Sequence, residues 1–187
     1  AGIIYRPYRE RSQERVKDLL QGSLACTGYE ELSLASLSTG DYSDIEPLIG
    51  ALMTTYRESR VSVSLPSLRV GTLTPAMIEA IAGTRKPGFT LAPEAGTERL
   101  RRVIIKPVSD LDLMDAAETI FASGWSVLKL YFMIGLPTET DEDLDGIIRL
   151  ANELFARGRR ASKRSIQLNI SISTFVPKPH TPFQWMG

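Results

Sequence analysis

The sequence has few of the side chains that cross-link proteins or bind transition metals. It contains one cysteine, Cys26, and one histidine, His180. One cysteine excludes an internal disulfide framework and is typical of a protein from a reducing compartment. These two residues are also too few for a zinc or iron–sulfur site, which needs several cysteine or histidine ligands. The chain alone therefore holds no such metal centre.

The sequence also lacks net charge and long apolar runs. Lysine and arginine total 22, as do aspartate and glutamate, so the formal net charge is zero. A neutral chain has no overall electrostatic attraction to nucleic acid or to an anionic membrane. No apolar run is long enough to cross a bilayer. We therefore expect a cytoplasmic protein without a membrane partner, and nucleic acid is not a favoured partner.

The composition does favour a globular domain with a core. Of the 187 residues, 43% are hydrophobic, which fits a single domain over residues 1–187. The chain opens on Ala1-Gly2-Ile3-Ile4 without an initiator methionine and ends as abruptly. We expect it to be part of a longer protein.

Segments with the pattern of strands alternate with amphipathic helical segments. The predicted strands span residues 31–36, 61–65, 88–92, 127–134 and 166–176. Residues 127–134 are almost continuously apolar, which is typical of a strand buried on both faces. Helices are predicted before the first strand, over residues 9–21, and after every strand but the last. This alternation indicates a parallel α/β sheet that is either doubly wound or curved towards a barrel.

Capping residues mark several predicted helix starts. Ser43, Ser109 and Thr140 each precede a helical segment, and Thr74-Pro75 begins another that ends at residue 83. The first helix has no strand before it, so we expect a strand to be missing upstream. Its absence would leave strand 31–36 with a free edge, through which we expect dimerisation.

Residues that follow the strands are the candidate site residues, because parallel sheets bind ligands at the carboxyl ends of their strands. The loop that begins at Ser36 is rich in hydroxyl groups. Glu94 offers an acceptor for ribose hydroxyls or an amino group, and Gly135 permits a close approach of the backbone. Each feature also fits an ordinary strand–helix loop, and His180, between prolines, fits a structural role.

Five segments, in this order and spacing, resemble the radical S-adenosylmethionine (SAM) superfamily of iron–sulfur enzymes. They are Ser-Leu-Ser-Thr-Gly-Asp-Tyr from residue 36, Ser-Leu-Pro-Ser-Leu-Arg from residue 64, Ala-Pro-Glu-Ala-Gly-Thr from residue 92, Gly-Leu-Pro-Thr-Glu-Thr from residue 135 and Phe-Val-Pro-Lys-Pro-His-Thr-Pro-Phe from residue 175. The resemblance extends from Ala1 to Trp185 and is strongest to a branch related to the methylthiotransferases.

The resemblance implies a partial, TIM-like (β/α)6 barrel whose first strand is missing from this chain. In the family, a three-cysteine loop after that strand binds a 4Fe-4S cluster, so these ligands are expected upstream of Ala1. Cys26 lies after the first helix and does not match a ligand position.

The resemblance also implies, position by position, which residues contact SAM. These are Ser36, Leu37 and Ser38 for its amino group, Glu94 for ribose or methionine, Lys106 for its carboxylate, and Gly135, Leu136 and Val176 near adenine. No catalytic acid or base is implied. Ile105 and Tyr131 depart from the family pattern, in which an asparagine and a ribose-binding aspartate are common.

The chemistry implied by the resemblance is one-electron chemistry. The cluster reduces SAM, which is cleaved to methionine and a 5′-deoxyadenosyl radical that removes a hydrogen atom from a substrate. Flavodoxin or ferredoxin is the expected reductant of the complete protein, and the sequence does not identify the substrate.

Two other classes of protein remain open at this point. A non-radical barrel enzyme of the aldolase or isomerase type would use a lysine such as Lys129. An RNA-binding module would use the basic residues between 157 and 164, although cations are also common at a helix C-terminus.

Overall fold

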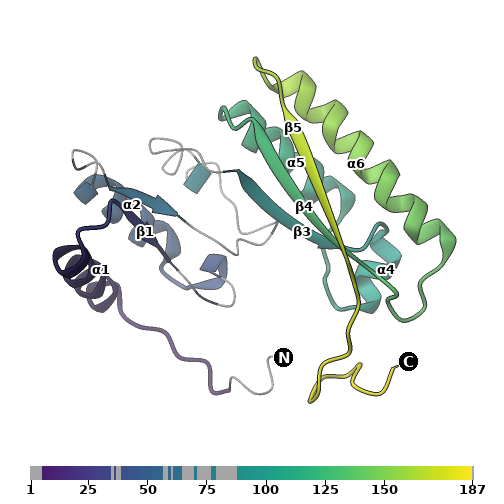
Figure 1. The fold of residues 1–187 in the computed structure, drawn as a ribbon, viewed down its shortest axis with the longest axis horizontal. Coiled ribbons are helices and arrows are strands. Elements are labelled where there is room, and N and C mark those ends of the chain that lie inside the picture. The colour runs from purple at the N-terminus through teal and green to yellow at the C-terminus, as the bar shows by residue number, and fades with distance from the viewer. Residues whose placement is uncertain are drawn as a thin grey trace.

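The computed structural model describes residues 6–34, 36, 39–56, 59, 61–64, 70, 77–78 and 88–186. Helices and strands alternate along them (Figure 1). The elements are α1 (Gln13–Thr27), β1 (Glu31–Ser33), the 3-10 helix η2 (Thr39–Asp41), α2 (Ile45–Tyr56), β2 (Ser62–Ser64), β3 (Phe89–Glu94), α4 (Glu98–Val103), α5 (Asp110–Ala122), β4 (Val127–Ile134), α6 (Asp141–Ala161) and β5 (Gln167–Thr174). All five predicted strands are confirmed. The helix predicted over residues 74–83 lies outside the described residues except for Met77 and Ile78.

All strand pairs are parallel, as predicted. β1 pairs with β2 in a two-stranded sheet, and β3, β4 and β5 form a three-stranded sheet in that order. The chain is therefore an α/β protein in which helices link β1 to β2, β3 to β4 and β4 to β5. Among the described strands, β1 is bonded to β2 alone, and dimerisation through its other edge stays a prediction.

The predicted helix caps are largely confirmed. The hydroxyl group of Ser109 accepts the backbone N–H of Asp112, and Thr140 immediately precedes α6. Thr97, which was not among the predicted caps, accepts the N–H of Leu100 at the start of α4. α2 begins at Ile45, one residue later than a cap at Ser43 predicts. None of the described helices is long and apolar enough to cross a bilayer.

The two faces of the three-stranded sheet differ in exposure. α5 and α6 pack together on one face, where Leu91, Leu128 and Leu130 have no exposed surface. On the other face of β4, Lys129 and Tyr131 are exposed. The prediction that β4 is buried on both faces is therefore wrong. The sequence pattern was misleading because Tyr131 counts as an apolar residue, although its side chain lies on the exposed face.

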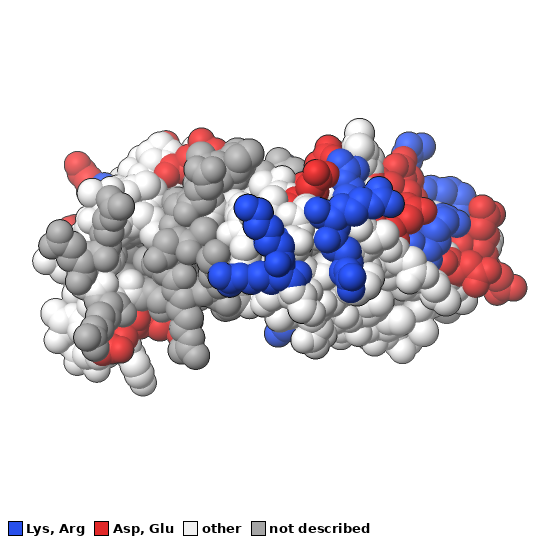
Figure 2. Space-filling model, turned by 90° about the horizontal axis from the view of Figure 1, so that it is seen from above, with Lys and Arg blue, Asp and Glu red and all other residues white. Residues whose placement is uncertain are grey.

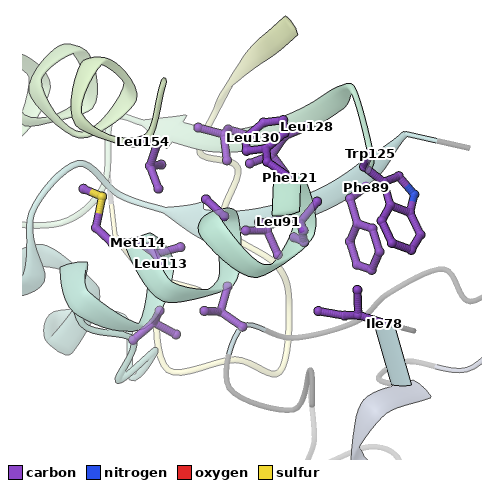
Figure 3. Packing of buried hydrophobic residues seen from close by; sticks show 14 of the residues in the cluster. Ile78, Phe89, Leu91, Leu113, Met114, Phe121, Trp125, Leu128, Leu130 and Leu154 are labelled. Carbon is purple, nitrogen blue, oxygen red and sulfur yellow. The ribbon is translucent and has the colours of Figure 1, made fainter. Parts of the chain in front are cut away.

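The core joins this sheet to the first half of the chain. The rings of Phe89 and Trp125 meet edge to face, with centroids 5.1 Å apart and planes at 81°. Ile78 lies beside these rings (Figure 3). Ile45 and Ile49 of α2 belong to the same buried cluster. Burial of apolar surface therefore fixes α2 relative to the sheet.

Two glycines allow α6 to cross the turn between β3 and α4 at close range. A Cβ atom on Gly96 would overlap the carbonyl oxygen of Asp143 and the backbone nitrogen of Ile147. A Cβ atom on Gly146 would lie 2.9 Å from the carbonyl oxygen of Gly96. Because the neighbouring atoms are backbone atoms, no side-chain rotation can make room.

We predict that Gly96→Ala lowers the free energy of unfolding by about 1–3 kcal/mol, because a methyl group would push α6 away from the turn. Gly50→Ala is the control, since a Cβ atom at this exposed position of α2 meets nothing within 4 Å. It should stabilise the helix by about 0.5–1 kcal/mol. Urea unfolding followed by circular dichroism measures both. Equal stability of the two variants would contradict the close approach.

Candidate functional site

The carboxyl ends of β3, β4 and β5 meet at one edge of the sheet. Beyond β5, the N–H of Phe175 still donates to the carbonyl of Ile134 at 2.8 Å. Leu136, after β4, is 4% exposed and packs with Ala95, which follows β3. Phe175 lies against the same small cluster. The turns after all three strands are therefore close together, and they form the candidate site.

An ion pair between two predicted site residues lies at this edge. The Lys106 ammonium is 2.7 Å from Glu94 Oε1, and the two side chains are 22% and 27% exposed. Glu94 is the last residue of β3 and has a φ of 70°, and Ile105, before Lys106, has a φ of 56°. Left-handed backbone at non-glycine residues is unfavourable and often occurs at functional sites. The structure thus brings Glu94 and Lys106 together, although they are 12 residues apart.

A buried arginine, Arg101, connects the turn after Glu94 with the loop that contains Lys106. Arg101 has no exposed surface, and its guanidinium donates to the carbonyls of Val108 at 2.8 Å and Ala95 at 3.0 Å. It also forms an ion pair with Asp110. Its own carbonyl accepts the N–H of Lys106 at 2.9 Å. Arg101 therefore ties the residue after Glu94 to the loop that contains Lys106.

Sequence reasoning missed Arg101. It is one of three arginines in a short helical segment, and nothing in the pattern separates it from Arg99 and Arg102, which are exposed or half-exposed. Only the tertiary structure shows that its helix face is buried.

A buried carboxylate fastens the N-termini of α4 and α6. Asp143 is 2% exposed and accepts hydrogen bonds from the hydroxyl of Thr97 and the guanidinium of Arg99. It also accepts from the N–H and hydroxyl of Thr140, at 2.9 and 2.8 Å. Burial by itself raises the pKa of Asp143, but these hydrogen bonds outweigh burial and hold its pKa far below the usual range. The Thr-x-x-Asp spacing, a capping box, is the sequence signal that could have identified it.

Gly135 is required for its backbone conformation. Its φ is 81°, and a Cβ atom there would meet nothing within 4 Å. Its N–H donates to Glu139 Oε2 at 2.6 Å, which closes the turn after β4. The left-handed conformation, rather than crowding, therefore explains the glycine at this strand end.

The remaining predicted residues are less closely associated. Val176 follows β5 at the same edge and is 69% exposed. Ser36 is exposed, and its hydroxyl lies 3.2 Å from that of Thr39. Leu37 and Ser38 lie outside the described residues. Among the described residues, the hydrogen bonds of this loop join Ser36 to Thr39 and Thr39 to Leu34, and none of them reaches the edge at Glu94. The predicted contacts of all these residues with SAM stay predictions.

The first residue of the basic segment, Arg157, lies in the last part of α6 and has structural partners. Arg157 donates to Glu118 at 2.6 Å and to Asp115 at 2.7 Å, both on α5. Its hydrogen bond with Glu118 is the main cause of its raised pKa. Figure 2 shows basic and acidic side chains side by side over the right-hand part of the molecule. Nearer the middle of this view several Lys and Arg side chains lie together with few acidic ones among them, and RNA binding stays an alternative.

Comparison with known proteins defines the class. The sequence matches the family model of the Radical SAM superfamily over residues 2–151, and the chain belongs to this superfamily. The resemblance inferred from the sequence is therefore confirmed, and the chain forms part of a radical SAM enzyme core.

Two similar proteins place the chain within longer molecules. An uncharacterized protein of Methanocaldococcus jannaschii is 33% identical over 184 residues, which cover 98% of this chain and 38% of the relative. The structure of coproporphyrinogen III oxidase from Escherichia coli, described as a radical SAM enzyme, matches with a TM-score of 0.65 and 12% identity. That match covers 91% of this chain and 39% of the oxidase, and at this identity it shows the shared fold alone. The chain thus spans about two fifths of each protein.

The two groups that the family implies differ in their fit to this chain. A cluster bound by three cysteines does not fit, because the sequence has one cysteine, Cys26, which is exposed on α1. No group of three potential metal ligands occurs within the part of the chain that the structure describes. SAM does fit, because its methionine end carries one positive and one negative charge. The pair of Glu94 and Lys106 offers the complementary charges.

We predict that Asp143→Asn lowers the free energy of unfolding near neutral pH by about 2 kcal/mol, because an amide cannot accept all four hydrogen bonds. The wild-type contribution has a defined pH dependence. Since the pKa of Asp143 is lower in the folded state than the usual value of about 3.9, its contribution is complete above that pH and is lost as the pH falls.

Urea unfolding between about pH 2 and pH 7 tests this, because the variant should lose less stability on acidification than the wild type. Asp145→Asn is the control, an exposed residue of the same helix that should keep the wild-type profile. An unchanged acid profile in Asp143→Asn would contradict the assignment.

Proposed function

We propose that this chain forms the SAM-binding part of a radical SAM enzyme that acts on a substrate by hydrogen-atom abstraction. A 4Fe-4S cluster, when bound with SAM, supplies an electron that cleaves SAM to methionine and a 5′-deoxyadenosyl radical. The observation that carries the proposal is the partly exposed ion pair of Glu94 and Lys106 at the carboxyl edge of the sheet, in a chain of this superfamily.

Lys106 binds the carboxylate of the methionine moiety in this proposal. The backbone of Lys106, from which the ammonium extends, is held in place because its N–H donates a hydrogen bond to the carbonyl of Arg101. In the free protein Glu94 pairs with this ammonium at 2.7 Å. Both side chains keep part of their surface exposed, so a ligand carboxylate can reach Lys106 from solvent.

Glu94 binds the ribose hydroxyls or the ammonium group of the same ligand. A carboxylate accepts hydrogen bonds from either. The opposite charges of the pair therefore orient SAM along the edge, with its methionine end at Lys106. Loss of either charge should weaken binding and leave the other charge without its partner.

The turns after β4 and β5 contact the adenine in this proposal. Gly135 adds no side chain, and the space around its Cα is open. Leu136 is buried and fixes the turn, while Val176 is exposed at the neighbouring strand end. Their backbone groups are the proposed contacts with the base.

The cluster ligands and the electron donor belong to the complete protein in this proposal. The three cysteines that bind the cluster cannot come from this chain, which has one. We place them on a loop upstream of Ala1, and we propose flavodoxin or ferredoxin as the reductant in the cytoplasm. The positioning of SAM and the exclusion of solvent are the roles left to this chain.

Lys106→Met should raise the KM for SAM by about tenfold or more, because a charged hydrogen bond to the ligand is lost. The measurement is 5′-deoxyadenosine formation by the complete protein after anaerobic cluster reconstitution and addition of dithionite. Lys163→Met, an exposed lysine at the opposite end of the sheet, is the control and should leave KM unchanged. Glu94→Gln should raise KM in the same direction as Lys106→Met.

Two results would overturn the proposal. One is a reconstituted wild-type protein that lacks iron–sulfur absorbance and forms no 5′-deoxyadenosine. The other is an unchanged KM in both Lys106→Met and Glu94→Gln, which would remove these residues from the SAM site.

A further inference from the structure

The face of the three-stranded sheet opposite α5 and α6 is polar. Side chains of paired residues in parallel strands point to the same face. The strand register aligns Thr90, Lys129 and Asn169 in one row across β3, β4 and β5. Two residues nearer the carboxyl ends of the strands, on the same face, Tyr131 pairs with Ser171. Leu128 and Leu130 point to the other face, where Figure 3 shows them grouped with Phe121 of α5.

This face is open and does not form a second core. Thr90, Lys129 and Ser171 are exposed, and Tyr131 is 44% exposed. The inner face of a closed barrel is ordinarily filled by layers of branched apolar side chains. A row of hydroxyl, amide and ammonium groups cannot pack in that way without unpaired polar atoms. The polar row is therefore accessible to solvent and to a ligand.

Lys129 is the charged group of this face. No carboxylate lies within ion-pair distance of its ammonium among the residues that the structure describes. In contrast, Lys106 and Arg157 have carboxylate partners. Its neighbours Thr90 and Asn169 lie about 4.8 Å away across the strands and offer hydrogen-bond donors. Asn169 Oδ1 already accepts the amide of Gln167 at 2.8 Å, so its NH₂ group remains available to an acceptor.

Lys129 lies too deep to serve the methionine end of SAM at Lys106. Glu94 pairs in register with Phe132, three residues beyond Lys129. At a rise of about 3.3 Å per residue, Lys129 is roughly 10 Å below the Glu94 level along the strand. One carboxylate cannot contact both ammonium groups while each side chain keeps its place. A second anionic group is therefore needed to account for Lys129.

We propose that the row of Thr90, Lys129 and Asn169 binds an anionic group of the substrate, a carboxylate or a phosphate. This inference rests on the proposed function and names the class of substrate for the same site. The Lys129 ammonium supplies the charge, and Thr90 and Asn169 donate hydrogen bonds to the remaining oxygens. A substrate anchored there would extend up the inner face, past Tyr131, towards the edge where SAM binds.

The test uses the complete protein with its lysines converted to ¹³C-dimethyl-lysine, a modification that keeps the charge. Inorganic phosphate and succinate are titrated separately, with chloride at matched ionic strength as the reference. The Lys129 signal, identified by its absence in Lys129→Met, should shift saturably with one of the two anions, whereas the signal of Lys163 should not. A stronger response to phosphate indicates a phosphorylated substrate, and a stronger response to succinate indicates a carboxylate.

Variants separate this inference from the proposed function. Anion binding, followed through the amide signals of ¹⁵N-labelled protein, should weaken about tenfold in Lys129→Met and recover in Lys129→Arg. Formation of 5′-deoxyadenosine without substrate should be unchanged in Lys129→Met, because this assay depends on Lys106. Anion binding that persists in Lys129→Met, or a Lys129 signal that responds no more than that of Lys163, overturns the inference. So does a raised KM for SAM in Lys129→Met. An unchanged KM for SAM in both Lys106→Met and Glu94→Gln, together with anion binding that still depends on Lys129, would contradict the proposed SAM site and not the anion site.

Discussion

The buried carboxylate of Asp143 is the interaction on which the geometry of the candidate site depends. It joins the first residues of α4 and α6, because Thr97, Arg99 and Thr140 all donate to its two oxygens. A carboxylate that accepts so many hydrogen bonds stays ionised although it is buried. The contact is close enough to form only because Gly96 and Gly146 have no side chains. The turns after β3 and β4 are thereby fixed relative to each other. The strand ends at the candidate site are held rigidly as a result.

Charges in this part of the molecule fall into two groups that differ in how fully they are satisfied. Arg101 and Asp143 are buried, and their hydrogen bonds end on groups of the protein itself. Removing either would leave a buried partner unsatisfied, which is costly, so their role is architectural. Glu94 and Lys106 keep part of their surface exposed, and Lys129 has no carboxylate partner among the described residues. Lys129 can exchange water for a ligand, and Glu94 and Lys106 can exchange their partly exposed ion pair for contacts with a ligand that carries both charges.

The sequence predicted the elements better than it predicted the faces of the sheet. The bounds of β4 and the cap at Ser109 follow from local pattern and local hydrogen bonding, and the structure confirms them. The proximity of Glu94 and Lys106 was suggested by the family resemblance. Local sequence patterns could not predict this contact, because Glu94 precedes α4 and Lys106 follows it. Arg101 could not be predicted, because its burial depends on tertiary contacts, among them its hydrogen bonds to the carbonyls of Ala95 and Val108. The inner face was misjudged because Tyr131 and Met133 made β4 look uniformly apolar.

The polar inner face also explains why the sheet can remain open without losing its core. Apolar burial is concentrated on the side of α5 and α6, where the residues of β3 and β4 are almost fully covered. The inner face of the described strands contributes little to that burial, so filling or emptying it changes the hydrophobic stabilisation only slightly. A barrel stabilised from its outer side can keep water inside and exchange it for a substrate. In this chain Asp143 and Arg101 hold the turns at the carboxyl ends of the strands, and the proposed anion site lies below them on the polar face, where a bound ligand would not disturb the core.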